Sequence, residues 1–165
     1  MFIKQEMGYT VAELTVAMGI MVIVAMLCSP LVMDFYQKTQ FKDTVLAIET
    51  AISKTRLTAL STGKEATLCP YSPKENCGLD WHNGFGIFQD HVGFTYHHEA
   101  IPDSVNLTQQ SSKNTEYLTF SPMGFTEQNG HFFITQSRGD CVYAAKVIVR
   151  KSGHSHTEES FDCSK

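Results

Sequence analysis

The chain has 165 residues, of which 42% are hydrophobic and 18% are charged. This length suits one modest domain, and this composition is typical of a folded protein and argues against disorder. The 13 basic and 17 acidic residues give a formal net charge of −4. The global charge therefore predicts neither a nucleic-acid partner nor binding to an anionic membrane surface.

The N-terminal region contains the most apolar segment of the chain. Residues 14–33 are almost continuously apolar. About 20 residues form roughly 30 Å of helix, which matches the hydrocarbon core of a bilayer. Pro30 falls near the end of this segment, where a proline removes one helical hydrogen bond and bends the axis. We therefore predict a membrane-spanning helix, followed by a soluble remainder.

The five cysteines divide in the same way. Cys28 lies inside the apolar segment, whereas Cys69, Cys77, Cys141 and Cys163 lie in the polar remainder. Four cysteines allow three pairings, and we favour Cys69–Cys77 and Cys141–Cys163 because each pair flanks a polar, turn-rich segment. Four reduced, buried cysteines are the alternative. Persistent disulfides indicate an oxidising compartment, which here is the periplasm or the cell surface.

A short polar stretch precedes the apolar segment. In a usual secretory signal the cleavage site follows the apolar stretch, whereas here it would come before it. The order Gly8-Tyr9-Thr10-Val11-Ala12-Glu13-Leu14 is similar to the processing motif of type IV prepilins and type II secretion pseudopilins. The resemblance implies that a prepilin peptidase removes residues 1–8 by cutting after Gly8, and that it then methylates the new amine of Tyr9.

Glu13 would become the fifth residue of the mature chain. An ionised carboxylate costs about 3 kcal/mol at the centre of a membrane helix and less near its edge. The helix dipole offsets part of its charge in the first turn. In a filament, the Tyr9 amine of a neighbouring subunit could pair with Glu13, so we expect Glu13→Ala to be inserted but poorly assembled. The alternative is a first-turn acid in the headgroup region.

The helix is expected to continue beyond the membrane. Apolar residues recur at three- and four-residue steps at Phe41, Val45, Ile48, Ile52, Ala59 and Leu60. Gly63 provides a C-terminal stop. We predict a leader at 1–8, a transmembrane half at 9–33, an amphipathic half at 34–63 and a β-rich periplasmic head at 64–165.

The remainder of the chain predicts short antiparallel strands. We expect them at residues 65–69, 85–89, 93–96, 105–108, 116–120, 131–136 and 143–151, separated by glycine- and proline-containing turns. The segment 127–130, which ends in Asn129-Gly130, predicts a hairpin. The fold class is therefore α+β, with antiparallel strands packed on the second half of a long helix.

A second set of residues narrows the resemblance. Leu68-Cys69-Pro70, Cys77, Trp81, Gly84-Phe85, Ile87-Phe88 and Asp90 are similar to the head of FimT/FimU-type minor pilins, which are related to the GspH pseudopilin. Phe120-Ser121-Pro122-Met123-Gly124 matches the later Phe-x-Pro-x-Gly segment of that family. For Trp81, Phe85 and Phe88 we expect core packing.

This resemblance implies a type IV pilin fold and a structural role without enzymatic activity. The expected function is that of a tip adaptor that assembles with major and minor pilins and supports pilus biogenesis, twitching and adhesion. The expected location is the inner membrane, with the head in the periplasm, and later the pilus at the cell surface. A type II secretion pseudopilin is an alternative.

DNA uptake in natural transformation is the other alternative, because some FimT-type pilins bind DNA through Gly-Arg-x-Arg in the last hairpin. Here that stretch is Gly153-His154-Ser155-His156, and histidine lacks the permanent forked charge of arginine. The remaining candidate DNA contacts are Arg138, Lys146, Arg150 and Lys151. Acidic residues follow them, and salt-dependent DNA affinity needs clustered cations, so we favour a solvated face.

No cofactor, metal site or catalytic motif is expected. His97-His98 and His154-x-His156 each provide two imidazoles, whereas zinc sites usually need three or four ligands. No nucleophile elbow, phosphate-binding loop or paired-carboxylate pattern is present.

Overall fold

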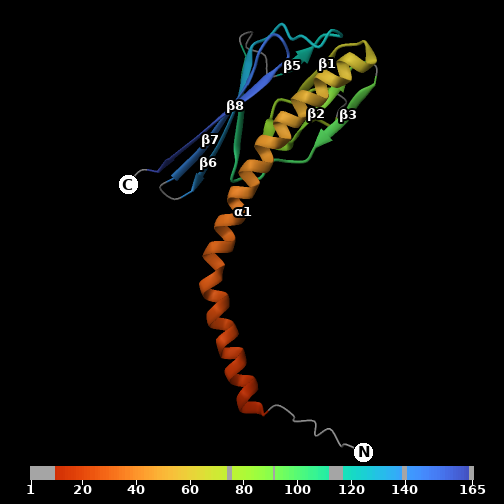
Figure 1. Ribbon diagram of the computed structural model, residues 1–165. Helices are drawn as coiled ribbons and strands as arrows, with labels where there is room; N and C mark the ends of the chain where they lie inside the picture. Colours follow the sequence, from red (N-terminus) through yellow and green to blue (C-terminus); the bar gives the residue numbers. More distant parts are fainter. Residues whose placement is uncertain (1–9, 74–75, 91, 112–116, 139–140, 164–165) are drawn as a thin grey trace, which may run out of the picture. The chain divides into compact units, whose positions relative to one another are not determined.

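The computed structural model describes residues 10–73, 76–90, 92–111, 117–138 and 141–163 (Figure 1). It contains one long helix, α1 (Val11–Thr62), and a short 3-10 helix, η1 (Trp81–Asn83). The strands are β1 (Ala66–Pro70), β2 (Phe85–Gln89), β3 (Gly93–His98), β4 (Asn106–Ser111), β5 (Leu118–Phe120), β6 (Gly130–Arg138), β7 (Cys141–Val149) and β8 (Ser155–Cys163).

The chain forms two compact units, Met1–Lys38 and Thr39–Lys165, and the division falls inside α1. The helix runs without interruption through Pro30 and through the boundary between the units. It ends where predicted, because Gly63 has a positive φ of 65° and its N–H donates to the Ala59 carbonyl over 3.0 Å. No linker therefore separates the apolar part of the helix from the head.

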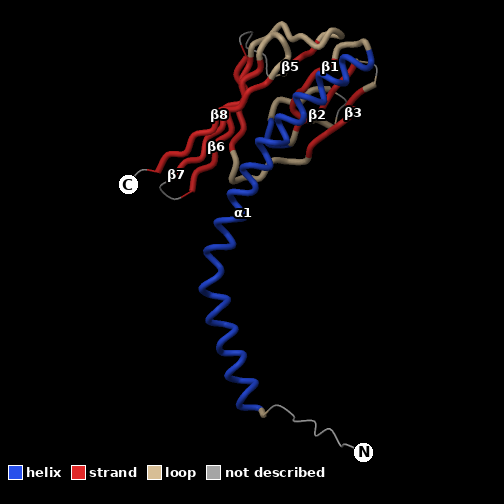
Figure 2. Tube along the Cα trace, viewed as in Figure 1, coloured by secondary structure: helices blue, strands red, loops and turns tan. Residues whose placement is uncertain are grey.

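The head, residues 39–165, contains two antiparallel sheets (Figure 2). The first has the strand order β3-β2-β1-β5, and the second has the order β4-β6-β7-β8. In the second sheet Gly130 of β6 pairs with Ser111 of β4 on one side and with Val149 of β7 on the other, so the register continues across these three strands. The predicted α+β class with antiparallel strands is confirmed, although the strands divide into two sheets.

One hydrophobic core joins the helix to both sheets. The helix contributes Phe41, Val45, Ile48, Ala51, Ile52 and Ala59; the first sheet contributes Leu68, Ile87 and Phe120; the second contributes Phe132, Ile134 and Val147. The predicted apolar stripe is confirmed except for Leu60, whose side chain is 47% exposed. The alternation of buried and half-buried residues over the second half of β7 follows from a sheet with one face on the core.

One predicted hairpin is wrong, and one strand is missing from the prediction. The segment ending in Asn129-Gly130 does not form a hairpin, because β5 pairs with β1 whereas β6 pairs with β4 and β7. It instead carries the chain from one sheet to the other. The second error is β8, which the sequence does not predict because its residues are mostly polar and it lies at the edge of its sheet.

Candidate functional site

The apolar first part of α1 is left uncovered by the residues that the structure describes. The 18-residue window Val11–Cys28 is long and apolar enough to cross a membrane, and none of it is buried. Its large hydrophobic side chains have exposed fractions between 52% (Val24) and 79% (Val11). Leaving them in water would be unfavourable by about 1.5–3 kcal/mol for each large side chain. This surface therefore requires lipid or another protein.

Glu13 lies in the first turn of α1 and forms a capping box with Thr10. Its Oε2 accepts a hydrogen bond from the Thr10 backbone N–H at 2.9 Å and another from the Thr10 hydroxyl at 3.0 Å. The Glu13 N–H in turn donates to the Thr10 hydroxyl oxygen over 3.2 Å. These bonds satisfy backbone donors that a helix N-terminus otherwise leaves unpaired. The residues predicted for processing, Gly8 and Tyr9, lie outside the described residues.

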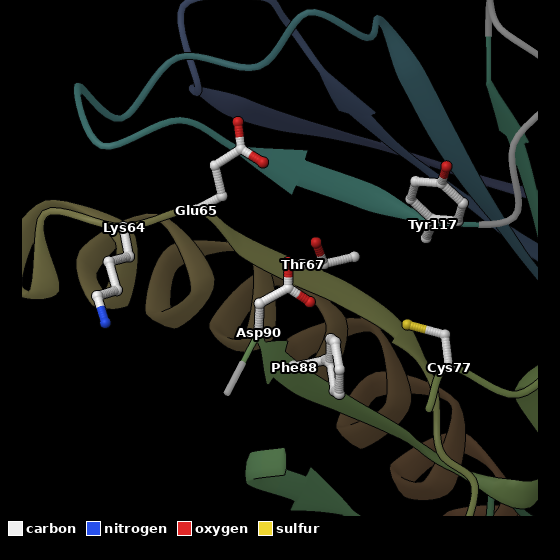
Figure 3. A pocket seen from close by; sticks show the side chains of 7 residues that line it. All are labelled: Lys64, Glu65, Thr67, Cys77, Phe88, Asp90 and Tyr117. Carbon is white, nitrogen blue, oxygen red and sulfur yellow. The ribbon is translucent and has the colours of Figure 1, made fainter. Parts of the chain in front are cut away.

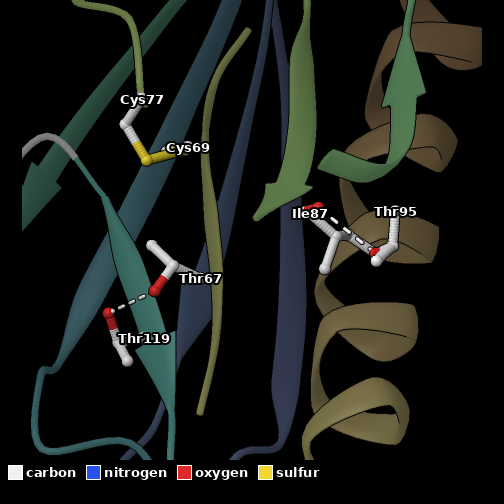
Figure 4. The surroundings of a disulfide bond; sticks show 6 residues. All are labelled: Thr67, Cys69, Cys77, Ile87, Thr95 and Thr119. Carbon is white, nitrogen blue, oxygen red and sulfur yellow. Dashed lines mark hydrogen bonds between the residues drawn. A yellow bond between two sulfur atoms is a disulfide. The ribbon is translucent and has the colours of Figure 1, made fainter. Parts of the chain in front are cut away.

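The first predicted disulfide is present. Cys69, at the buried end of β1, is bonded to Cys77 (Figure 4). Beside it, the hydroxyl groups of Thr67 and Thr119 are 3.0 Å apart across the β1–β5 pair. The bond therefore ties the loop after β1 to the sheet, while the free Cys28 is exposed.

The other predicted pair lies at the opposite end of the head. Cys141 is disulfide-bonded, and Cys163 is directly opposite it in the register of β7 and β8. The described part of Cys163 is limited to its backbone, so its pairing with Cys141 stays a prediction.

The candidate DNA contacts with described lysine or arginine side chains lie on β7 and at the turn that follows it. Lys146 lies 5.4 Å from the centre of the Phe133 ring, and the Cα register places it opposite Glu158. Arg150 and Lys151 are exposed at the turn between β7 and β8, where the Arg150 N–H donates to the His154 carbonyl.

The last two candidates are His154, which precedes β8, and His156, which lies on β8. His154 and His156 are exposed, and His156 pairs with Ile148. The side chain of Arg138 lies outside the described part of the structure. The arrangement therefore provides two neighbouring cations at one turn, which is few for DNA binding.

A shallow pocket lies on the outer side of the first sheet (Figure 3). Its volume is about 430 Å³, and Phe88, Thr67 and Asp90 line it together with Cys77 and Tyr117. Phe88 is thus half-buried on the outer face, contrary to its predicted place in the core, whereas Trp81 and Phe85 are buried as predicted.

The paired histidines of β3 make ring contacts. His97 stacks on Tyr71 at 4.7 Å between ring centres, and His98 stacks on Phe85 at 4.9 Å. Burial lowers the pKa of His98; neighbouring Glu99 opposes this shift, and His97 adds to it. Over the described ranges, no three His, Cys, Asp or Glu side chains gather closely enough to hold a metal ion.

These features define a class of protein. An exposed apolar helix that continues directly into a head, where its second part packs with antiparallel strands, is the architecture of pilins and pseudopilins. Residues 44–153, two thirds of the chain, match the family described as type II transport protein GspH. The chain belongs to this family.

The fold is also similar to solved structures. Two crystal forms of the type IV minor pilin FimU of Pseudomonas aeruginosa PAO1 match with TM-scores of 0.56 and 0.50 and sequence identities of 17% and 16%. These matches cover 75% and 73% of this chain and 92% and 91% of FimU. Among curated proteins none matches. The predicted resemblance to GspH and to the FimU fold is confirmed.

Proposed function

We propose that the protein is a minor type IV pilin, held in the inner membrane by α1 and then built into a pilus through the same helix. The carrying observation is the unburied apolar window Val11–Cys28 at the start of a helix that ends inside the head. Lipid covers this surface before assembly, and the helices of neighbouring pilins cover it afterwards. A prepilin peptidase removes residues 1–8 and methylates Tyr9 before the subunit enters the fibre.

Within the pilus, the proposed role is that of an adaptor that links minor pilins at the tip to the main fibre. Through this role the protein supports pilus biogenesis, twitching and adhesion. The similarity to FimU supports a minor pilin fold, and the weak basic character of the β7–β8 turn favours a structural role over DNA binding. The head carries the contacts to specific neighbours, since the apolar helix is chemically uniform.

Mass spectrometry of the protein purified from piliated cells tests the processing step. We expect a mature chain that lacks Met1 to Gly8, has a methylated Tyr9 and contains two disulfides. A chain that keeps its first eight residues in the pilus fraction would refute the proposal. Glu13→Ala provides the assembly test, with normal processing and membrane insertion but loss from sheared pili. Normal incorporation of that variant would show that Glu13 has no role in assembly.

A second candidate function is that of a type II secretion pseudopilin. The description of the matching family, a type II transport protein, favours it, and the anchor and head would serve both systems equally. Deletion of the gene separates the two functions. Loss of twitching with normal protein secretion supports the pilus, whereas retained exoproteins in the periplasm with intact pili support the secretion system.

DNA uptake is a third candidate, favoured by the two exposed cations at the β7–β8 turn, Arg150 and Lys151. A gel-shift titration of the purified full chain at low salt measures it. Micromolar binding that disappears when both residues are changed to Ala would establish DNA binding. The absence of a shift would leave the adaptor role as the better description.

A further inference from the structure

A cleft lies between the C-terminal part of α1 and the turn that joins β7 to β8. It encloses about 400 Å³. The helix contributes Ser53, Arg56, Leu57 and Leu60 to its lining, and the turn contributes the residues from Gly153 to Ser155. All of these residues belong to the head.

The backbone of two loops fixes the Arg56 side chain in this cleft. Its Nε donates a hydrogen bond to the Gly124 carbonyl oxygen over 3.0 Å. Gly124 and Gly153 have positive φ angles of 75° and 79°, which disfavour other residues. A Cβ atom at Gly124 would lie 3.1 Å from Arg56 Nε, and one at Gly153 would lie 2.9 Å from it. The two glycines thus allow the loops to enclose the stem of the arginine.

The two terminal nitrogens of the Arg56 guanidinium make no hydrogen bond with the described residues. Among the residues that the structure describes, the bond from Nε is the single hydrogen bond of the Arg56 side chain, and no ion pair involves it. The two terminal nitrogens of a guanidinium form a planar fork that matches a carboxylate. Since Arg56 is half-buried and its stem is held in place, little further ordering of its side chain is needed to bind an anion.

The rest of the lining indicates which anion fits. Leu57 and Leu60 are 64% and 47% exposed, so one wall of the cleft is apolar. A polyanion is disfavoured, because Glu158, Glu159 and Asp162 follow on β8 and the chain has a net charge of −4. A single carboxylate beside an apolar group complements both the fork and the leucines.

We propose that this cleft binds a glutamate or aspartate side chain, flanked by an apolar residue, on the head of a neighbouring pilin subunit. The identity of the partner rests on the proposed function, since a pilin places its head against other subunits. Exposed Leu57 would be covered by the apolar residue of the partner, and Arg56 would bind the carboxylate with both terminal nitrogens. The contact would select the neighbour, which the uniform apolar helix cannot do.

NMR titration of the full chain in detergent micelles tests the proposal. The chain has three arginines, so their Nε–Hε signals are few, and Arg56 provides a direct reporter. The probes are the peptides acetyl-Leu-Glu-Leu-amide and acetyl-Leu-Gln-Leu-amide, inorganic phosphate, and a short oligothymidylate. We expect saturable shifts at Arg56 and at the Gly153 amide with the glutamate peptide, and binding at least tenfold weaker with the glutamine peptide.

Three variants locate the binding. Arg56→Gln removes the fork, and Leu57→Asp places a carboxylate on the apolar wall at an exposed position that the core does not use. Each should weaken binding of the glutamate peptide at least tenfold, as followed at the Gly153 amide. Arg150→Gln is the matched control, because it removes one positive charge from the adjoining turn without lining the cleft.

Equal loss of binding in the Arg150 and Arg56 variants would overturn the proposal, since only net charge would then matter. It would also be overturned if phosphate or the oligonucleotide bound more tightly than the glutamate peptide, or if no probe gave a saturable shift. These measurements need no assembled pilus. A negative result would therefore leave the proposed function intact, because processing and incorporation test that separately.

Discussion

Reduction of the Cys69–Cys77 disulfide should destabilise the head by about 2.5 kcal/mol, the loop-closure entropy for a separation of eight residues. The closed loop leads from buried β1 to η1, where Trp81 packs edge-on against Phe132 at 5.2 Å between ring centres. Since domains are stable by about 5–15 kcal/mol, this loss is a substantial fraction of the total. The loss should therefore be visible as a shift of the unfolding midpoint.

Trp81 makes the measurement specific to the head, because it is the single tryptophan of the chain and only 5% exposed. Urea unfolding of the full chain in a mild detergent is followed by its fluorescence, with and without reductant. Cys141 and Cys163 are replaced by Ala so that one disulfide remains. With a denaturant slope of about 1–3 kcal/mol/M, the midpoint should fall by about 1–2.5 M urea.

Equal midpoints for the oxidised and reduced chains would refute the reasoning, because the loop would then be ordered without its bond. The matched control is Cys28→Ser in the same background. Cys28 is free and exposed outside the head, so its replacement should leave the midpoint unchanged.

Three further predictions concern single side chains. Gly153→Ala should destabilise the head by about 2–3 kcal/mol in the same urea assay, because the added Cβ would clash with the Gly124 carbonyl oxygen. The control Gly93→Ala has a similar φ but open space around the added Cβ, so it should destabilise the head by about 1 kcal/mol. Because burial lowers the pKa of His98, the folded head binds fewer protons than the unfolded chain, and its stability should fall as the pH drops below about 6.5. His98→Gln should reduce this loss of stability. An unchanged dependence of stability on pH in that variant would contradict the prediction. Thr10→Val should speed hydrogen exchange at the Glu13 amide about fivefold or more, as expected for loss of a cap of about 1 kcal/mol, whereas Thr10→Ser should not.

The sequence predicts the helix and its end well for a physical reason. Local signals specify both: the three- and four-residue spacing from Phe41 to Ala59, and a glycine at position 63 in the left-handed conformation. Most strands are also predicted, because each is a short run rich in apolar residues between glycine- and proline-containing turns. The helix boundaries differ from the prediction by about two residues at most, as fraying and capping allow.

The predictions that fail concern features that depend on contacts between distant parts of the chain. β8 is polar along most of its length, and its position depends on pairing with β7 and on the bond from the Thr157 hydroxyl to the Glu49 carboxylate. The Asn129-Gly130 turn has the composition of a hairpin, but the core places the flanking strands in different sheets. A local turn signal cannot show which strands will become neighbours.

The same distinction applies to the sites. The capping box of Thr10 and Glu13 is a Thr-x-x-Glu pattern that precedes an apolar run, so a closer reading of the sequence could have found it. The Arg56 cleft has no such signal. It requires Gly124 and Gly153 to meet one helical turn, and their separation along the chain hides that contact until the fold is known.

The capping box uses one of the two carboxylate oxygens of Glu13. Both Thr10 bonds reach Oε2, and among the described residues no group donates to Oε1. A carboxylate has about four acceptor positions, so the amine of a neighbouring subunit could bind Oε1 while the cap persists. Helix capping and the proposed role of Glu13 in assembly can therefore be separated by experiment.

Glu13→Gln separates them. The amide keeps a carbonyl oxygen that can accept the Thr10 bonds, but it lacks the charge that attracts an amine. Hydrogen exchange at the helix N-terminus should therefore resemble that of the unaltered chain, while the amount of protein in sheared pili falls as far as it does for Glu13→Ala. If Glu13→Gln enters pili normally, the cap alone accounts for the glutamate, and the predicted pairing with the Tyr9 amine is wrong.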